Sequence, residues 1–176
     1  MINNPLTSEE VNLVTTIMEK LKPGFLPFPI FNQVARLVVM PIIDVVPVRK
    51  DASGNVEVLL TQRENNDPLW PGMWHNPGTV VRATDHPNDY IDAFTRIFKD
   101  ELGIAAVGQL KPTFVTDLFH HTRRGAEATR IYWLELTEEP RIGTFFDVHK
   151  LPDNTIETHI QIIHAAAEAF QQAKAA

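Results

Sequence analysis

Two adjacent carboxylates and a nearby arginine form the part of this sequence best suited to chemistry on phosphates. Asp100 and Glu101 follow Arg96 in a segment whose apolar residues recur at helical spacing. Residues three and four apart share a helix face, so we expect Arg96 to pair with Asp100. By the same rule Ile97 should lie beside Glu101, on the face towards the cleft. A carboxylate pair that faces a cleft suits a hard cation such as Mg²⁺, which takes one or two protein carboxylates together with substrate phosphates and water.

Such an ion would neutralise phosphate charge and lower the pKa of an attacking water. An alternative interpretation of Asp100 and Glu101 is a solvated face near a helix end. Gly103 also has a purely structural explanation, since a glycine just after the last helical turn is a common cap. Arg96, Gly103 and the upstream run Trp-His-Asn-Pro-Gly, residues 74 to 78, together favour the phosphate site.

The segment from Gly78 to Ile104 resembles the Nudix box, the strand-loop-helix signature of enzymes that hydrolyse diphosphates. The family pattern is glycine, five residues, glutamate, seven residues, then arginine-glutamate-hydrophobic-any-glutamate-glutamate-any-glycine-hydrophobic. Its second half is matched except that Ile97 replaces a carboxylate and Asp100 is shorter than glutamate by one methylene. In the first half Thr84 replaces the glutamate, and four extra residues around 85 to 88 separate the halves.

The resemblance implies a Nudix-like hydrolase that cleaves a diphosphate linkage in a nucleotide or related metabolite, using water and Mg²⁺ or Mn²⁺. Asp100 and Glu101 would hold the metal, and Arg96 would orient these carboxylates. Arg96 and Glu101 are therefore the expected catalytic residues. Ile97 and Thr84 instead favour a catalytically inactive Nudix-fold protein that binds a nucleotide-like ligand. A third interpretation is a coincidental match in an unrelated α+β domain.

Four further residues are expected to contact the substrate. The Arg63 guanidinium could grip phosphate, the Trp70 ring could stack on a base, and Gly78 is the first glycine of the box. Glu127 lies in the segment where many Nudix enzymes place an extra carboxylate ligand or base. For Glu127 the alternative is a solvated loop residue. For Trp70 the alternative is packing in the core.

Other candidates have weaker support. Solvation at the surface is the simpler interpretation of Arg123 and Arg124. His120 and His121 alternate on a strand, so at most one of them can face the cleft.

Composition excludes several classes of function. The net charge of −6 argues against a protein that binds nucleic acid, since that affinity comes from basic patches. The absence of cysteine excludes disulfides, thiolate metal sites and cysteine nucleophiles. It also excludes the activity of isopentenyl diphosphate isomerases, which share the Nudix fold but rely on a catalytic cysteine. No long apolar run or basic leader is present, so we expect a soluble cytoplasmic protein without membrane contact.

The elements that must position these residues follow from local patterns. A capping box at Thr7 predicts a helix over residues 8 to 21, after which residues 25 to 31 should be extended and irregular. Residues 36 to 48 read as a strand interrupted at Pro41 and Pro47, hence near a sheet edge or a bulge. This strand should form a hairpin with residues 56 to 62.

Three elements are expected after this hairpin. Asn88 or Asp89 should cap the box helix. Residues 114 to 121 and 129 to 136 form a second hairpin, and a helix follows Asp153 and Asn154.

This mixture of strands and helices predicts an α+β protein. The resemblance implies a Nudix-like α/β/α sandwich with a mixed β-sheet over residues 36 to 176, preceded by an N-terminal helix and a Pro/Phe-rich extension over residues 1 to 35. The extension carries more apolar surface than the domain needs. Such surface is commonly buried between subunits, so we expect a homodimer with residues 6 to 31 in the contact.

Overall fold

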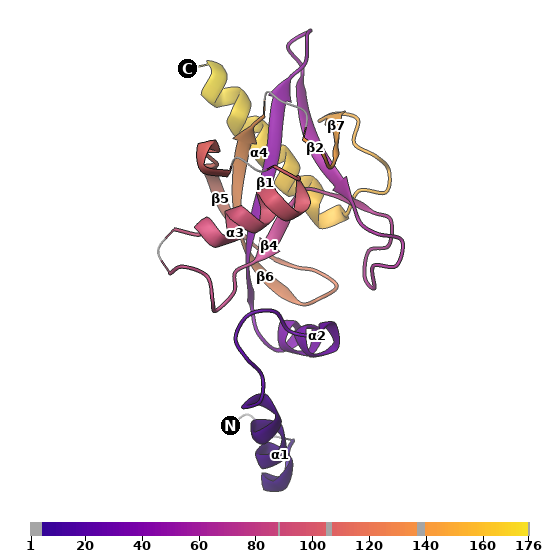
Figure 1. The fold of residues 1–176 in the computed structure, drawn as a ribbon. Helices are drawn as coiled ribbons and strands as arrows, with labels where there is room; N and C mark the ends of the chain where they lie inside the picture. Colours follow the sequence, from indigo (N-terminus) through magenta and orange to yellow (C-terminus); the bar gives the residue numbers. More distant parts are fainter. Residues whose placement is uncertain (1–4, 88, 105–106, 137–139, 176) are drawn as a thin grey trace.

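A computed structural model describes residues 5–87, 89–104, 107–136 and 140–175 (Figure 1). The N-terminal part contains α1 (Ser8–Met18) and α2 (Phe28–Leu37), followed by the strands β1 (Met40–Lys50), β2 (Val56–Gln62), β3 (Trp74–His75) and β4 (Gly78–Val80). The box helix is α3 (Ile91–Arg96), which continues as the π-helical segment η1 (Ile97–Glu101). After the 3₁₀ turn η2 (Val107–Gln109) come β5 (Thr113–His121), β6 (Ala126–Glu135), β7 (Thr144–Asp147) and α4 (Glu157–Ala175).

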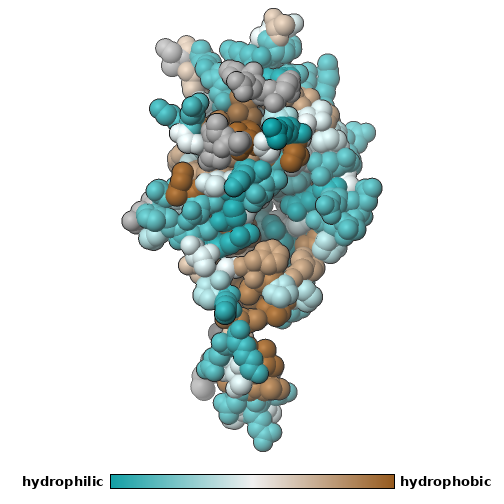
Figure 2. All heavy atoms as spheres, viewed as in Figure 1, coloured by the Kyte–Doolittle hydropathy of each residue, from teal (hydrophilic) through white to brown (hydrophobic). Residues whose placement is uncertain are grey.

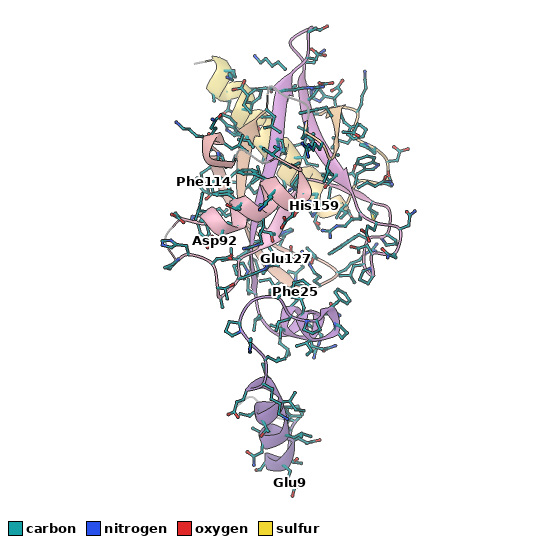
Figure 3. All side chains as sticks on the ribbon, in the orientation of Figure 1. Glu9, Phe25, Asp92, Phe114, Glu127 and His159 are labelled. Atoms are coloured by element: carbon teal, nitrogen blue, oxygen red, sulfur yellow. The ribbon has the colours of Figure 1, made fainter. Side chains whose placement is uncertain are left out.

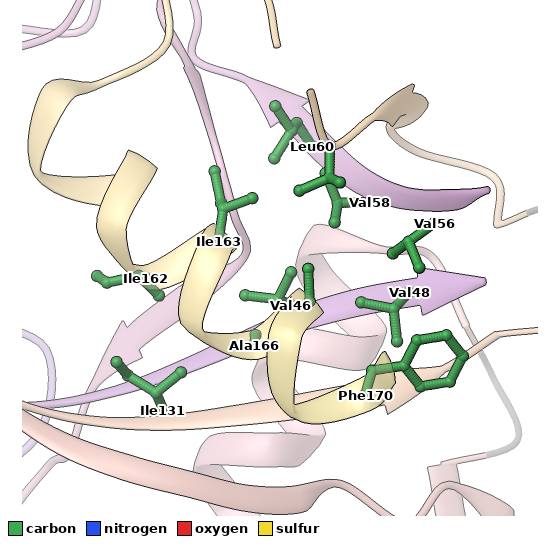
Figure 4. Packing of buried hydrophobic residues seen from close by; sticks show 12 residues of the cluster. Val46, Val48, Val56, Val58, Leu60, Ile131, Ile162, Ile163, Ala166 and Phe170 are labelled. Atoms are coloured by element: carbon green, nitrogen blue, oxygen red, sulfur yellow. The ribbon is translucent and has the colours of Figure 1, made fainter. Parts of the chain in front are cut away.

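The strands form one mixed sheet in the order β3-β2-β1-β6-β5, with β4 added to β1 and β7 added to β2. The central strand β1 runs parallel to β6 over Met40 to Val48 and antiparallel to β2 and β4. Helices cover both faces of the sheet. Successive side chains of a strand point to opposite faces, so β1 contributes to the core on each side. Val46 and Val48 pack against α4, as Figure 4 shows, whereas Ile43 and Val45 pack against α3 and η1. The predicted α/β/α sandwich is confirmed.

Several predicted elements are confirmed. Thr7 and Glu10 form both hydrogen bonds of a capping box. The first hairpin has β2 at residues 56 to 62, with Asp51 accepting hydrogen bonds from the backbone of Ser53 and Asn55 in its turn. Gly103 follows η1 with φ 65°, as a helix cap requires. Asn88, one of the two expected caps of α3, lies outside the described residues.

The prediction for Pro41 and Pro47 was wrong, because β1 is a continuous central strand. Its second neighbour changes along its length: Ile42 to Asp44 pair with β4, and pairing with β2 begins at Val48. Pro47 lies in the gap between these two ladders and Pro41 lies just before the first. A proline there removes no ladder hydrogen bond, so it is tolerated inside the sheet.

The extended segment expected over residues 25 to 31 is also corrected. Helix α2 begins at Phe28, and Pro29 occupies its first turn, where a missing backbone N–H costs nothing. Its residue Ala35 is fully buried, and Phe31 packs with Met40 and Ile42 at the start of β1.

Helix α1, by contrast, projects away from the rest of the molecule, and none of its residues is buried (Figure 1). Hydrophobic side chains remain visible on the surface over α1 and α2 (Figure 2). No helix in the described part of the chain is long and apolar enough to cross a membrane.

Candidate active site

A cavity of about 670 Å³ opens between the sheet, α4 and the N-terminal extension. Figure 3 shows Phe25, Glu127 and His159 distributed along this region, from the extension towards α4. Its polar lining comes from elements that are distant in the sequence: Asp44, Arg63, Glu101, Arg124, Glu127 and His159. Its apolar lining includes Phe25, Phe28, Phe31 and Val34 of the extension. The cavity therefore joins a charged region to an apolar one.

Two carboxylates converge on Gly78 at the polar side of this cavity. Oε2 of Glu101 accepts a hydrogen bond from the backbone N–H of Gly78 at 3.2 Å. The Asp44 carboxylate lies so close to the Gly78 Cα that a Cβ at this position would collide with it, and the carbonyl of Ile43 closes the same space. Glycine is required at position 78 because the strand β4 must pass directly against this carboxylate.

Asp44 and Glu127 are buried and Glu101 is half-buried, so the negative charges of these carboxylates repel one another. Burial raises the pKa of Asp44 to about 8, and the negative charges of Glu127 and Glu101 contribute to this rise. Burial likewise raises the pKa of Glu101 to about 7, although the Gly78 N–H and Arg63 oppose that effect. A site that concentrates negative charge in this way favours a cation.

Glu101 and Asp44 fit Mg²⁺ as a pair, because this ion commonly uses one or two protein carboxylates and completes its shell with phosphates and water. Within the described ranges no group of three His, Cys, Asp or Glu side chains is placed to hold a metal ion. The residues present therefore suit an ion that depends on the substrate for the rest of its ligands.

Comparison with known proteins identifies the fold. No family model matches the chain, and no curated protein sequence matches it. A MutT/nudix family protein from Listeria innocua is 13% identical with a TM-score of 0.58, covering 77% of this chain and 96% of that one. This chain has the Nudix fold. An Ap4A hydrolase from C. elegans is 20% identical with a TM-score of 0.56, over 76% of this chain and 99% of that chain. The C-terminal domain of mouse MUTYH, solved in complex with human PCNA, is 15% identical with a TM-score of 0.58, over 77% and 91%.

Within this Nudix fold the expected carboxylate pair is divided. Glu101 lines the cavity, whereas Asp100 is exposed and does not line it. The expected pairing of Arg96 with Asp100 is also replaced, because the Arg96 guanidinium binds Asp85 instead. The cause is the π-helical segment that starts at Ile97. Hydrogen bonds between residues five apart widen the turn, so residues three and four apart no longer share one face as they do in an α-helix.

Placing Ile97 in the cleft was wrong. Its side chain is fully buried in the core, together with Ile43, Val45 and Phe98. An apolar residue at this position contributes to packing below the sheet and has no access to the cavity. The Nudix box has a carboxylate at the position of Ile97. On η1 only Glu101 lines the cavity, so no other residue of this segment replaces that carboxylate.

Arg63 and Arg124 supply positive charge to the cavity. Their guanidinium groups lie 5.7 and 5.2 Å from the centre of the Trp70 ring. Trp70 itself is only 6% exposed, so its ring supports the two arginines rather than offering an open face for a base. Nε of Arg63 is buried without a hydrogen-bond partner in the described part of the chain. Nη1 of Arg63 lies 3.4 Å from Oδ2 of Asp67, and the side chain stays 29% exposed, so its guanidinium group can also meet an anionic ligand in the cavity.

Glu127 is buried, not solvated in a loop, because β6 already begins at Ala126. Its Oε1 accepts hydrogen bonds from Nε of Arg124 and Oγ1 of Thr122, both at 3.0 Å. Arg124, assigned from the sequence to the surface, is therefore held inside the site by Glu127. The three-residue spacing of opposite charges was the only local signal for this pair.

Two further cavity residues were missed in the sequence. Asp44 interrupts a run of apolar residues in β1, and an isolated carboxylate in a buried strand is a signal for function that could have been used. His159 lies on α4, far from the box, and no local pattern connects it with Glu101. It reaches the cavity only because α4 packs across the sheet.

Proposed function

We propose that this protein hydrolyses a diphosphate linkage in a nucleotide or related metabolite bound in the cavity. The observation that carries the proposal is the convergence of Glu101 and Asp44 on Gly78, in a cavity that also contains Arg63 and Arg124. Carboxylates and arginines together suit a substrate whose phosphates arrive with a divalent ion. Similarity to an Ap4A hydrolase and a MutT/nudix protein supports this chemistry.

Mg²⁺ or Mn²⁺ would be held by Glu101 and Asp44. The ion would offset the phosphate charge and lower the pKa of a bound water. Arg63, whose side chain is 29% exposed, would bind phosphate oxygens through the accessible part of its guanidinium group. Arg124 is fixed by Glu127 and would add positive charge to the same region.

A second function, ligand binding without hydrolysis, is favoured by Ile97. This residue stands where the Nudix box has a carboxylate, and its side chain is buried in the core. With fewer oxygen ligands the protein could bind a nucleotide-like compound without hydrolysing it. One protein with the same fold, the MUTYH domain, was solved bound to a protein partner, so the fold also serves binding.

The two functions are separated by a matched pair of variants. Diadenosine tetraphosphate, a nucleoside triphosphate and a nucleotide sugar would be incubated with the protein and Mg²⁺, and phosphate products measured. We expect Glu101→Gln to lower the rate by about 100-fold or more, because even partners of metal ligands cost 10 to 100-fold when changed. Asp100→Asn, at the exposed neighbouring position, should retain the rate within about twofold.

Equal loss in both variants would contradict the assignment to Glu101. Tight binding of one compound by calorimetry, without hydrolysis by the unchanged protein, would establish the second function instead.

The remaining expectations about partners stay predictions. The net charge of −6 still argues against a nucleic-acid ligand, and a small diphosphate remains the expected one. A cytoplasmic location and a homodimer are likewise proposals.

A further inference from the structure

His159 is held in one orientation by a chain of hydrogen bonds at the cavity wall. Its Nδ1 lies 2.7 Å from Oδ1 of Asn76. Asn76 is fully buried, its Nδ2 donates to the carbonyl of Pro77 at 3.2 Å, and its side chain also forms a hydrogen bond with Asp44. An amide nitrogen only donates and an amide oxygen only accepts. The Pro77 carbonyl and the Asp44 carboxylate are acceptors, so the Nδ2 atom of Asn76 must point towards them. Oδ1 must therefore face His159.

This arrangement determines the tautomer of His159. An amide oxygen can only accept, so the proton of the neutral imidazole must be on Nδ1. The other nitrogen, Nε2, then carries a lone pair. Nε2 has no hydrogen-bond partner in the described ranges, and the ring lines the cavity. His159 consequently presents a hydrogen-bond acceptor to whatever the cavity contains.

Two nearby histidines cannot play this role. Both nitrogens of His75 are used, by the backbone carbonyl of Asn76 at 2.8 Å and by Oγ1 of Thr61 at 3.2 Å. Nε2 of His120 contacts Oγ1 of Thr129 at 3.0 Å, and His120 is not among the residues that line the cavity. Nδ1 of His120 has no partner in the described part of the chain, but it is buried away from the cavity. Of these three rings, only His159 offers an unoccupied acceptor that lines the cavity.

The surroundings keep His159 uncharged until a ligand arrives. Burial lowers its pKa well below 6.5, and the neighbouring His75, Arg63, Arg124 and His120 lower it further. Phosphate bound to the arginines would offset their positive charge and so make Nε2 a stronger base. The ring would gain basicity only when the substrate is present.

We propose that Nε2 of His159 accepts the proton of the attacking water, an inference that rests on the hydrolysis proposed above. As the water oxygen bonds to phosphorus, its proton passes to Nε2. The bond from phosphorus to the bridging oxygen breaks, and its electron pair leaves with the second phosphate group. The imidazolium then returns its proton to solvent. Asn76 is a positioning residue, because it holds the ring in the tautomer that leaves Nε2 free.

The tautomer is tested first, without a ligand, by imidazole ¹⁵N NMR on protein labelled in histidine. Assignment comes from the spectrum of His159→Gln. The expected signal is a neutral ring protonated on Nδ1, with a pKa well below 6.5. A ring protonated on Nε2, or one that charges near pH 6.5, would overturn the inference regardless of any enzyme activity.

Kinetics test the catalytic role, on whichever of the three named compounds the unchanged protein hydrolyses. His159→Gln keeps a group able to bond Asn76 but is no base, so kcat should fall by about 100-fold or more while KM changes less than about threefold. His164→Gln, at an exposed position on the same helix, is the control and should behave like the parent.

A folded His159→Gln protein with kcat within about fivefold of the parent would overturn this inference alone. If the parent hydrolyses none of the compounds, the proposed function fails, and the base role fails with it.

Discussion

Arg96 and Asp85 form a two-point ion pair that closes the loop between β4 and α3. Nη1 lies 2.5 Å from Oδ1 and Nη2 lies 2.8 Å from Oδ2, while Nη2 also donates to the carbonyl of Val80 at 3.1 Å. Asp85 belongs to the extra residues that break the spacing of the Nudix box. Thr84 occupies the position of the glutamate in the Nudix box, and the next residue, Asp85, forms the ion pair with Arg96.

Replacing Asp85 by asparagine should destabilise the protein mainly at neutral pH. The hydrogen bond from Arg96 is the largest cause of a lowered pKa of Asp85, and burial opposes it. A carboxyl whose folded pKa is lower than its unfolded value stabilises the fold above the unfolded pKa, near 3.9, and loses that contribution as the pH falls through the folded pKa. We expect Asp85→Asn to cost about 2–3 kcal/mol at pH 7 in urea unfolding.

The penalty of Asp85→Asn should shrink as the pH falls below about 4, where the parent carboxyl also becomes neutral. Asp153→Asn, at an exposed position, is the control and should change stability by less than about 0.5 kcal/mol. A penalty that stays constant from pH 7 to about pH 3 would mean that shape, not charge, holds the loop.

Ile97→Glu should unfold the protein rather than restore a metal ligand. The side chain is fully buried, and an unpaired carboxylate there would cost several kcal/mol. Ile97→Val should cost only about 0.5–1.5 kcal/mol. Ile91→Glu is the surface control, because Ile91 on α3 is 47% exposed. The melting temperature of each variant would be measured with and without Mg²⁺. If the ion stabilised only Ile97→Glu, residue 97 would have to face the cleft.

Gly78→Ala should damage the site through its contact with Asp44. The added methyl group would occupy the space of the Asp44 carboxylate and press on the carbonyl of Ile43. We expect a loss of about 1–3 kcal/mol in unfolding free energy and weaker Mn²⁺ binding by calorimetry. Gly108→Ala, where the new methyl group meets nothing within 4 Å, is the matched control. Unchanged Mn²⁺ binding in a folded Gly78→Ala protein would show that Asp44 is not a ligand.

The exposed face of α1 should mediate homodimer formation. Leu13 and Ile17 are 61% and 48% exposed, and Val14 and Met18 beside them are exposed as well. An isolated helix of this length is marginal in water, so α1 needs a partner surface to remain helical. We expect light scattering to give the mass of a dimer, and Leu13→Glu with Ile17→Glu to give a monomer that keeps its thermal transition.

Asn12→Glu, on the polar side of α1, is the control for this dimer test and should leave the mass unchanged. Deletion of residues 1 to 21 should also give a monomer, since α2 and the cavity wall remain. A dimer of undiminished stability after this deletion would refute the role of α1.

Local interactions explain what could be predicted from the sequence. The capping box at Thr7, the turn at Asp51, the strand β2 and the helix cap at Gly103 each depend on residues within four or five positions of one another. Propensity, caps and turn chemistry act over that range, so their patterns are visible along the chain. The same reasoning led to Glu101, because the box helix is itself a local unit.

The composition of the site was decided by tertiary structure. Asp44 on β1 and Glu101 on η1 come together at Gly78. This residue of β4 pairs with Asp44 and donates its backbone N–H to Glu101. His159 joins them only because α4 packs across the sheet and Asn76 bonds its ring. The local helix rule also failed at Ile97 and Asp100, where core packing and a π-helical turn override it. Sequence separation conceals such contacts, since each depends on the pairing and packing of distant segments.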